Sequence, residues 1–198
     1  MIESPFTETF SFSGNKMETV LAKGRERTLL SGEATLASEN TKIYADNIEI
    51  YGENFQYAIS TGNVHVIYLE EGIELTSDSL FYNRKNGVSR TQGNATLIDR
   101  KNEIVAKGGH IEDRPNRNET IIQIGVRILS EDIIARAEFV RYNRGDNTLE
   151  LSGLPILTWK GDEYQASRIF LDIKGNNVRL EGTVTGEISN AVTPALRP

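Results

Sequence analysis

Short alternations of apolar and polar residues recur along the chain, each beside a glycine. In "TGNVHV" (residues 61–66), Val64 and Val66 alternate with polar residues, the period-two pattern of a strand with one buried face. Related segments are "SGEATL", "QGNATL", "IGVRIL", "SGLPIL" and "EGTVTG", which begin at residues 31, 92, 124, 152 and 181. No stretch of helical length keeps apolar residues at i, i+3, i+4 and i+7. The pattern therefore predicts an all-β protein.

The spacing of these segments is regular. Successive equivalent positions lie 30, 31, 31, 29 and 29 residues apart. The positions are Gly32, Gly62, Gly93, Ile124, Gly153 and Gly182. At the fourth position Ile124 stands where the other copies have glycine, and the glycine follows as Gly125. A period this constant predicts about six stacked repeats of ~30 residues.

A second landmark repeats with the same period and predicts a corner in each unit. In "IELTSDSLFYN" (residues 73–83) the apolar positions are Ile73 and Leu75, then Leu80 and Tyr82, so the parity changes between them. A strand whose parity changes must bend or bulge if both halves are to face one core. The other copies span residues 43–51, 134–143 and 164–172, with a looser copy, "IVAKGGHIED", at 104–113. Each unit is predicted to run strand, loop, strand, corner, strand, turn, strand.

Turn-forming residues fall where this scheme requires them, at residues 83–87, 143–147 and 173–177. With neighbouring strands ~4.8 Å apart, six units predict a column roughly 30 Å tall, with unpaired strands at both ends. We expect a single domain over residues 1–186 and a C-terminal tail over 187–198.

The inward-facing positions form one apolar stripe through the predicted column. They are Val64, Val66, Ile73, Leu75, Leu80, Tyr82, Ala95, Leu97, Ile104, Val126, Ile128, Val140, Leu157 and Ile169. Burial of such residues stabilises any core at about 25 cal/mol per Å². Residue types alone do not distinguish a packed core from an interior that opens for a ligand.

Composition narrows the class of protein. The chain has 198 residues, of which 38% are hydrophobic and 25% charged, an ordinary globular composition. Its net charge of −6, with 22 scattered basic residues, argues against nucleic-acid binding. The absence of cysteine excludes disulfides and thiolate metal sites. The opening "MIESPFTETF" has no secretory signal, so we expect either a cytosolic protein or a signal that has been removed.

The sequence contains few candidates for catalytic or metal-binding residues. His65 lies between two inward valines, so we expect it on a solvated face, and His110 lies beside glycines in the loose corner. Asp46, Asp78 and Glu138 recur at equivalent positions, where a corner needs a short side chain that accepts backbone N–H groups. We find no nucleophile beside a base, and we expect no enzyme activity, no cofactor and no metal site.

The repeat resembles the LptA/OstA family of periplasmic lipopolysaccharide-transport proteins, which share their fold with LptC and the N-terminal domain of LptD. The residues that carry the resemblance are "TGNVHVIYLEEGIELTSDSLFYN" at 61–83, "QGNATL" at 92–97 and "SGLPILTW" at 152–159, and it covers about residues 10–186. It implies a β-jelly roll shaped like an open taco, a periplasmic location and no enzyme activity. It also implies that the stripe holds lipopolysaccharide acyl chains, while the end strands bind further copies head to tail and LptC-like and LptD-like partners.

Two other hypotheses remain open. A structural β-solenoid would polymerise through its end rungs without a ligand. A solenoid enzyme acting on polysaccharide is weaker, because outward residues such as Glu49 and Glu74 do not form a convincing pair of catalytic carboxylates. Within the resemblance, six repeats favour a free bridge over an anchored LptC-like protein or an LptD domain. The segment "FTETFSFSG" (residues 6–14) is expected to add an edge strand or a partner contact.

Overall fold

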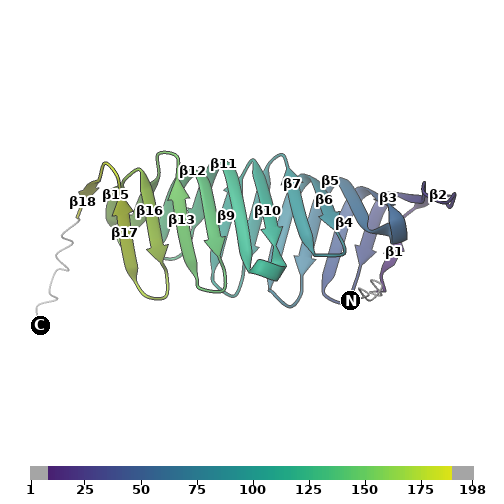
Figure 1. The fold of residues 1–198 in the computed structure, drawn as a ribbon, viewed down its shortest axis with the longest axis horizontal. Coiled ribbons are helices and arrows are strands. Elements are labelled where there is room, and N and C mark those ends of the chain that lie inside the picture. Colours follow the sequence, from purple (N-terminus) through teal and green to yellow (C-terminus); the bar gives the residue numbers. More distant parts are fainter. Residues whose placement is uncertain (1–8, 189–198) are drawn as a thin grey trace, which may run out of the picture.

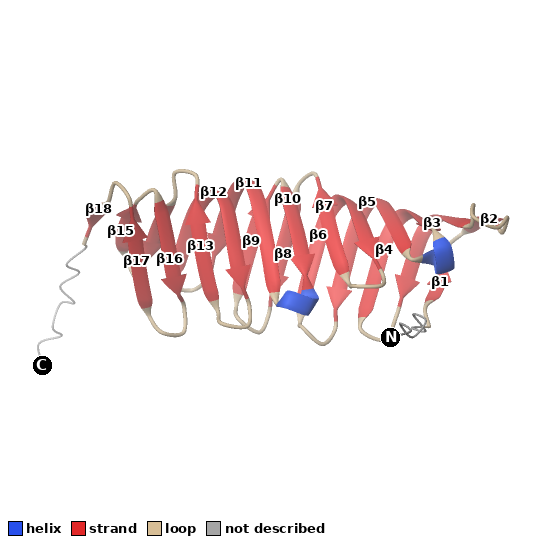
Figure 2. Cartoon of the chain, in the orientation of Figure 1, coloured by secondary structure: helices blue, strands red, loops and turns tan. Residues whose placement is uncertain are grey.

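A computed structural model describes residues 9–188 and shows an elongated all-β fold of the jelly-roll type (Figure 1). Within residues 9–188, eighteen antiparallel strands are joined by short turns, with the 3-10 turns Glu53–Phe55 and Pro115–Arg117 between them (Figure 2). The strands are β1 Ser11–Ser13, β2 Lys16–Val20, β3 Arg27–Ala37, β4 Thr41–Tyr51, β5 Tyr57–Tyr68, β6 Ile73–Asn83, β7 Val88–Gln92, β8 Ala95–Asp99, β9 Ile104–Gly108, β10 His110–Arg114, β11 Glu119–Leu129, β12 Ile133–Asn143, β13 Thr148–Ser152, β14 Ile156–Trp159, β15 Asp162–Gln165, β16 Arg168–Asp172, β17 Asn177–Glu181 and β18 Thr185–Glu187. Among the described residues, no helix is both long and apolar enough to cross a bilayer.

In its described part the chain runs back and forth as twelve long strands, each bent near its middle. Six of them, β3, β4, β5, β6, β11 and β12, continue through the bend. The other six break there into the pairs β1/β2, β7/β8, β9/β10, β13/β14, β15/β16 and β17/β18. The bends stack along one edge, which we call the corner line, and the half-strands on either side of it form two walls.

Strand pairing defines the two walls. Wall 1 contains β2, β7, β10, β13, β16, β17 and residues 27–31, 47–51, 57–61, 79–83, 119–123 and 139–143. Wall 2 contains β1, β8, β9, β14, β15, β18 and residues 34–37, 41–45, 64–68, 73–77, 126–129 and 133–137. The inner faces of the walls enclose the core, and the edge opposite the corner line, where the turns lie, we call the mouth.

The corners show why the parity of the stripe changes. Between β5 and β6 the register shifts from Thr61 to Val64, so that two residues of β5 are left out of the ladder. One of them, Gly62, has φ +74°, and a side chain there would strike the carboxylate of Asp46 on the neighbouring strand. Gly93 has the same relation to Asp78. Glycine at these corners is therefore required both for the bulge and for the close approach of the next strand.

At the fourth corner the glycine and the larger residue change places. The larger residue, Ile124, stands at the glycine position of the repeat, and the glycine, Gly109, is on the neighbouring strand. Ile124 and Gly125 both have positive φ, and the side chain of Ile124 lies over Gly109, where a Cβ atom would be only 3.0 Å from the Ile124 Cβ. Gly109 belongs to the loose copy of the repeat, and its N–H donates to the Ile124 carbonyl at 2.9 Å. The missing glycine and the loose corner are thus one local adjustment.

The predicted order of elements in each unit is confirmed, but the predicted height is wrong. From Gly32 to Gly62, for example, the chain passes through the end of β3, a turn, the bent β4, a second turn and the start of β5. Each unit therefore adds two bent strands rather than one rung. Twelve strands ~4.8 Å apart span about 53 Å, not roughly 30 Å.

Both ends of the described fold carry edge strands. β1 and β2 pair with β3, and no other pairing is recorded for them among residues 9–188. At the other end β17 pairs with β16 and β18 with β15. The expected edge strand in residues 6–14 is present as β1, although residues 6–8 lie outside the described part, as does the expected tail from residue 189 onward.

Candidate functional site

All fourteen stripe residues lie between the two walls. Their exposed fractions range from 0%, as at Leu75 and Leu97, to 6% at Tyr82. They belong to a continuous core of aliphatic and aromatic side chains that runs from Leu30 near one end to Leu171 near the other. Alternation along each half-strand places them there, since both halves of a bent strand present every second residue inward.

The interior leaves very little empty space at its N-terminal part. A cavity of about 10 Å³ lies between the walls, lined by Phe10, Leu36, Ser38, Thr41, Ile43, Tyr82 and Arg84. That volume is close to the minimum for a single water molecule and far too small for an acyl chain. The stripe residues elsewhere are at most 6% exposed, so in the described conformation a lipid would enter only if the walls separate.

Polar residues gather on the inner side of the mouth, and two contacts join one wall to the other. The Tyr142 hydroxyl of β12, in wall 1, donates to Asp99 of β8, in wall 2, at 2.9 Å. The Tyr68 hydroxyl of β5, in wall 2, donates to Ser89 of β7, in wall 1, at 2.7 Å. These two contacts, which we call the mouth bridges, tie the walls together at the edge remote from the corner line.

Burial determines the ionisation of the mouth bridges. Desolvation, followed by the neighbouring Asp99 carboxylate, raises the pKa of Tyr142 well above its ordinary value. Desolvation also raises the pKa of Tyr68, and the negative charge of the Asp113 carboxylate raises it further. Asp99 is held in addition by the N–H groups of Lys101 and Asn102, both at 3.0 Å. Both tyrosines therefore stay protonated and act as donors.

A buried ion pair lies beside the bridges. Arg144 donates through Nη1 to Asp113 and to the Thr120 hydroxyl, and Thr120 donates to Asp113 at 2.7 Å. The Asp113 and Arg144 side chains are only 2% and 7% exposed. Desolvation raises the pKa of Asp113, and the charge of Arg144 opposes the rise. Nη2 of Arg144 is buried without a hydrogen-bond partner among the described residues.

A third group closes the N-terminal part of the mouth. The Arg84 guanidinium lies 3.6 Å from the centre of the Phe10 ring, and its Nη1 donates to the Phe55 carbonyl at 2.7 Å. Phe10 precedes β1 of wall 2, whereas Arg84 follows the wall 1 half of β6. This cation–π contact therefore also crosses from one wall to the other.

This polar group was not predicted from the sequence, although a signal for it is present there. Asp99 lies two residues after Leu97, and Tyr142 lies two residues after Val140, so both continue the inward alternation. Asp113 stands in the same relation to Ile111. The same parity that predicts the apolar stripe places these polar side chains inside the mouth.

The recurring carboxylates lie along the corner line and bind groups of the neighbouring corner. Asp78 accepts the Asn94 N–H at 3.1 Å, and Glu138 accepts the Gly125 N–H at 3.2 Å. Asp46 instead accepts from the side-chain amide of Asn63, at 3.1 Å. Within the described residues no group of three or more His, Asp or Glu side chains could hold a metal ion.

The two histidines lie apart from the interior. His65 is on the outer face of wall 2, with Nε2 3.5 Å from Glu74 and its ring 6.1 Å from that of Tyr44. His110 contacts the Thr91 carbonyl through Nδ1. As predicted, the parity of His65 points it away from the core.

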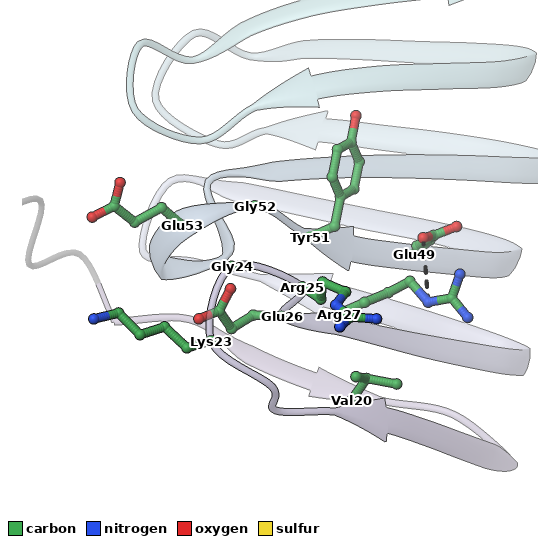
Figure 3. A pocket seen from close by; sticks show the side chains of 10 residues that line it. All are labelled: Val20, Lys23, Gly24, Arg25, Glu26, Arg27, Glu49, Tyr51, Gly52 and Glu53. Carbon is green, nitrogen blue, oxygen red and sulfur yellow. Dashed lines mark ion pairs between the residues drawn. The ribbon is translucent and has the colours of Figure 1, made fainter.

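An open hollow of about 930 Å³ lies outside the walls, near the N-terminal edge (Figure 3). Its lining combines basic side chains such as Lys23 with acidic ones such as Glu53, and Arg27 Nε lies 3.7 Å from Glu49. None of the fourteen stripe residues lines it. The hollow is therefore separate from the predicted lipid site.

Among the comparisons with known proteins, only the one with solved structures finds matches. No protein-family model and no curated protein sequence matches the chain. A solved structure that is similar to it is that of LptH, the LptA homologous periplasmic component of the conserved lipopolysaccharide transport device from Pseudomonas aeruginosa. The two are 9% identical over 92% of this chain and 96% of that one, with a TM-score of 0.29. A likeness that weak carries no argument about function, which has to be argued from the chain itself.

Proposed function

We propose that the protein binds lipopolysaccharide without covalent chemistry and carries it across the periplasm, with the acyl chains held between the two walls. The observation that carries this proposal is the continuous apolar interior, which runs from Leu30 in β3 to Leu171 in β16. An enzyme would need a localised site, whereas this interior offers the same aliphatic surface along its whole length.

Opening at the mouth would admit the lipid. The corner line is held by a continuous chain and by backbone pairing, whereas the mouth is joined by side-chain contacts such as Tyr142 with Asp99 and Tyr68 with Ser89. Separation of the walls at the mouth would expose Leu75 and Leu97 to acyl chains. The sugar and phosphate groups would stay at the mouth beside polar residues, because their burial without partners is costly.

The end strands support the proposed assembly. All five residues of β2 and all three of β18 are exposed, and an exposed strand edge pairs readily with another strand. We propose that these ends join further copies head to tail and bind LptC-like and LptD-like partners.

Site-specific photo-crosslinking tests the proposal. A photoreactive residue replaces either Leu75, which is fully buried, or Glu74, which faces outward and pairs with Arg100 at 2.7 Å. Both proteins are incubated with lipopolysaccharide and irradiated. Crosslinking at position 75 but not at 74 is expected. Equal labelling, or none at position 75 in a folded protein, would contradict an interior lipid site.

A structural protein that assembles through its ends is the second candidate. The burial of all fourteen stripe residues, which are at most 6% exposed, favours it. Sedimentation over a range of protein concentrations separates the two functions. Assembly that grows with concentration, combined with an absence of lipid crosslinks at position 75, would make the structural role the better account.

A further inference from the structure

The charged side chains on the outer faces of the two walls are arranged differently. On wall 1, Arg90 pairs with Glu112 at 2.9 Å and Arg114 pairs with Glu119 at 2.8 Å. Arg141 lies 3.3 Å from both Glu119 and Glu150. Opposite charges thus alternate from strand to strand, so this face is close to neutral.

Wall 2 carries a row of cations instead. Lys107 of β9 lies directly opposite Arg127 of β11, which lies opposite Arg136 of β12. All three side chains are exposed, and among residues 9–188 none of them has an ion pair or a hydrogen bond. Like charges directly opposite each other destabilise a sheet. The row is also unexpected in a chain with a net charge of −6.

Exposed aliphatic residues border this row toward the corner line. Ile124 is 65% exposed and Leu154 is 89% exposed, and Ile156, which lies opposite Arg136, is 36% exposed. We call these three residues, with Lys107, Arg127 and Arg136, the cationic ridge. Glu138 is the carboxylate on this stretch of the corner line, and it is occupied by the Gly125 N–H. The acidic turn of Glu131 and Asp132 lies at the far end of the same strands, toward the mouth.

The backbone conformation of Ile124 and Leu154 is a second observation that distinguishes these exposed aliphatic residues. Leu154 has φ +56° and Ile124 has φ +69°, a region that bulky side chains rarely occupy. At the equivalent position of the first two corners the chain has the polar residues Glu33 and Asn63, with φ +50° and +48°, and at the third it has Asn94, whose N–H binds Asp78. A leucine at this position is unfavourable for the backbone and leaves apolar surface in water, and a contact with an apolar surface outside the chain would offset the second cost.

We propose that the cationic ridge docks the protein on an anionic lipid surface. The corner line is a projecting edge, so Ile124 and Leu154 can enter the boundary between headgroups and acyl chains. The guanidinium groups of Arg127 and Arg136 then lie at the level of the lipid phosphates, which they bind as planar donors. The acidic turn points away from the lipid. This proposal does not depend on lipid inside the walls.

Vesicle co-sedimentation tests the docking. Vesicles of equal parts phosphatidylglycerol and phosphatidylcholine are compared with vesicles of phosphatidylcholine alone, at low and at physiological salt. Because each basic residue near an anionic surface contributes about 5-fold, Arg127→Gln with Arg136→Gln should weaken binding to the anionic vesicles about 30-fold. The control, Arg90→Gln with Arg179→Gln on wall 1, changes the net charge equally and should bind as the wild type does.

Leu154→Asn separates docking from folding. It restores the residue type of the equivalent corners, so the variant should melt at the same or a higher temperature while binding the anionic vesicles several-fold more weakly. Equal losses in the ridge variant and the wall 1 control would overturn the proposal, since net charge alone would then explain binding. Failure of the wild type to bind anionic vesicles would also overturn it and would favour an acidic protein segment as the occupant.

Discussion

The corner side and the mouth side of the interior are built from different side chains. Near the corner line the inner faces present mostly aliphatic residues such as Val64, Leu80 and Val126. Near the middle of the mouth they present Asp113 and Tyr142, which are equally buried. The aliphatic side is held by contacts that have no preferred direction, whereas the polar side is held by specific donors and acceptors.

This difference assigns separate roles to the two sides of a lipid carrier. Aliphatic side chains can exchange contacts with one another for contacts with acyl chains at little cost. Hydrogen bonds between the walls, such as that from Tyr142 to Asp99, have to break before the walls can part. We therefore expect the corner side to hold the fold together and the mouth side to control opening.

The largest effect is expected from a charge placed among the aliphatic residues. Leu75 is 0% exposed, and in Leu75→Asp an ionised carboxylate would be buried without a partner. We expect a loss above ~4 kcal/mol in the free energy of unfolding, enough to unfold many domains. Circular dichroism and urea titration measure it, with the outward Glu74→Ala as the control.

A folded Leu75→Asp variant that no longer crosslinks to lipopolysaccharide through a photoreactive residue at Leu97, which lies opposite position 75, would contradict this division of roles. It would mean that water reaches the corner side readily, so that the interior is an open groove rather than a packed core. The distinction between a structural side and an opening side would then be lost.

A smaller effect is expected at the buried ion pair. Arg144→Met leaves Asp113 buried without its cation, which typically costs about 3–5 kcal/mol near neutral pH. Burial already raises the pKa of Asp113 in the folded protein, and loss of the guanidinium raises it further. The exposed Arg179→Met provides the control.

The sign of the pH dependence follows from that raised pKa. Between the unfolded and folded pKa values of Asp113, the folded protein binds more protons than the unfolded one, so its stability falls as the pH rises through this window. The window is wider in Arg144→Met, so its deficit relative to the wild type should grow with pH and shrink in acid. Urea unfolding at several pH values measures this, and a deficit independent of pH would show that Asp113 is not the cause.

The repeat and its parity were predictable because both depend on local sequence. Alternation around Val64 and the change of parity after Leu75 place each side chain inward or outward, and all fourteen predicted residues are inside. The height was wrong because the spacing of glycines counts units and not strands, and each unit contains a strand in each direction. Asp46 and Asp78 are at corners, as the pattern of recurring short acidic residues indicates.

Features that depend on pairing between distant strands were not predictable. Asp99 and Tyr142 lie 43 residues apart in the sequence, and only the packing of one wall on the other brings them together. The row of Lys107, Arg127 and Arg136 likewise requires the register of three strands. In the sequence these cations look scattered, and their shared face is invisible without the pairing.

The smallest effect on stability, and the one that bears most directly on opening, is expected at the mouth bridges. Tyr142→Phe and Tyr68→Phe each remove one buried hydrogen bond, worth about 1 kcal/mol. Because Asp99 keeps the N–H groups of Lys101 and Asn102, the cost at that site should stay near this value.

Opening should respond more strongly than stability does. If the bridges limit separation of the walls, the double variant should bind a fluorescent fatty acid faster than the wild type while remaining folded. Tyr164→Phe is the matched control, because among residues 9–188 its hydroxyl makes a single hydrogen bond, a long one of 3.4 Å to Asp162 on its own strand. Unchanged uptake in the double variant would mean that the walls open elsewhere, with the Arg84–Phe10 contact at the N-terminal part of the mouth as the next place to test.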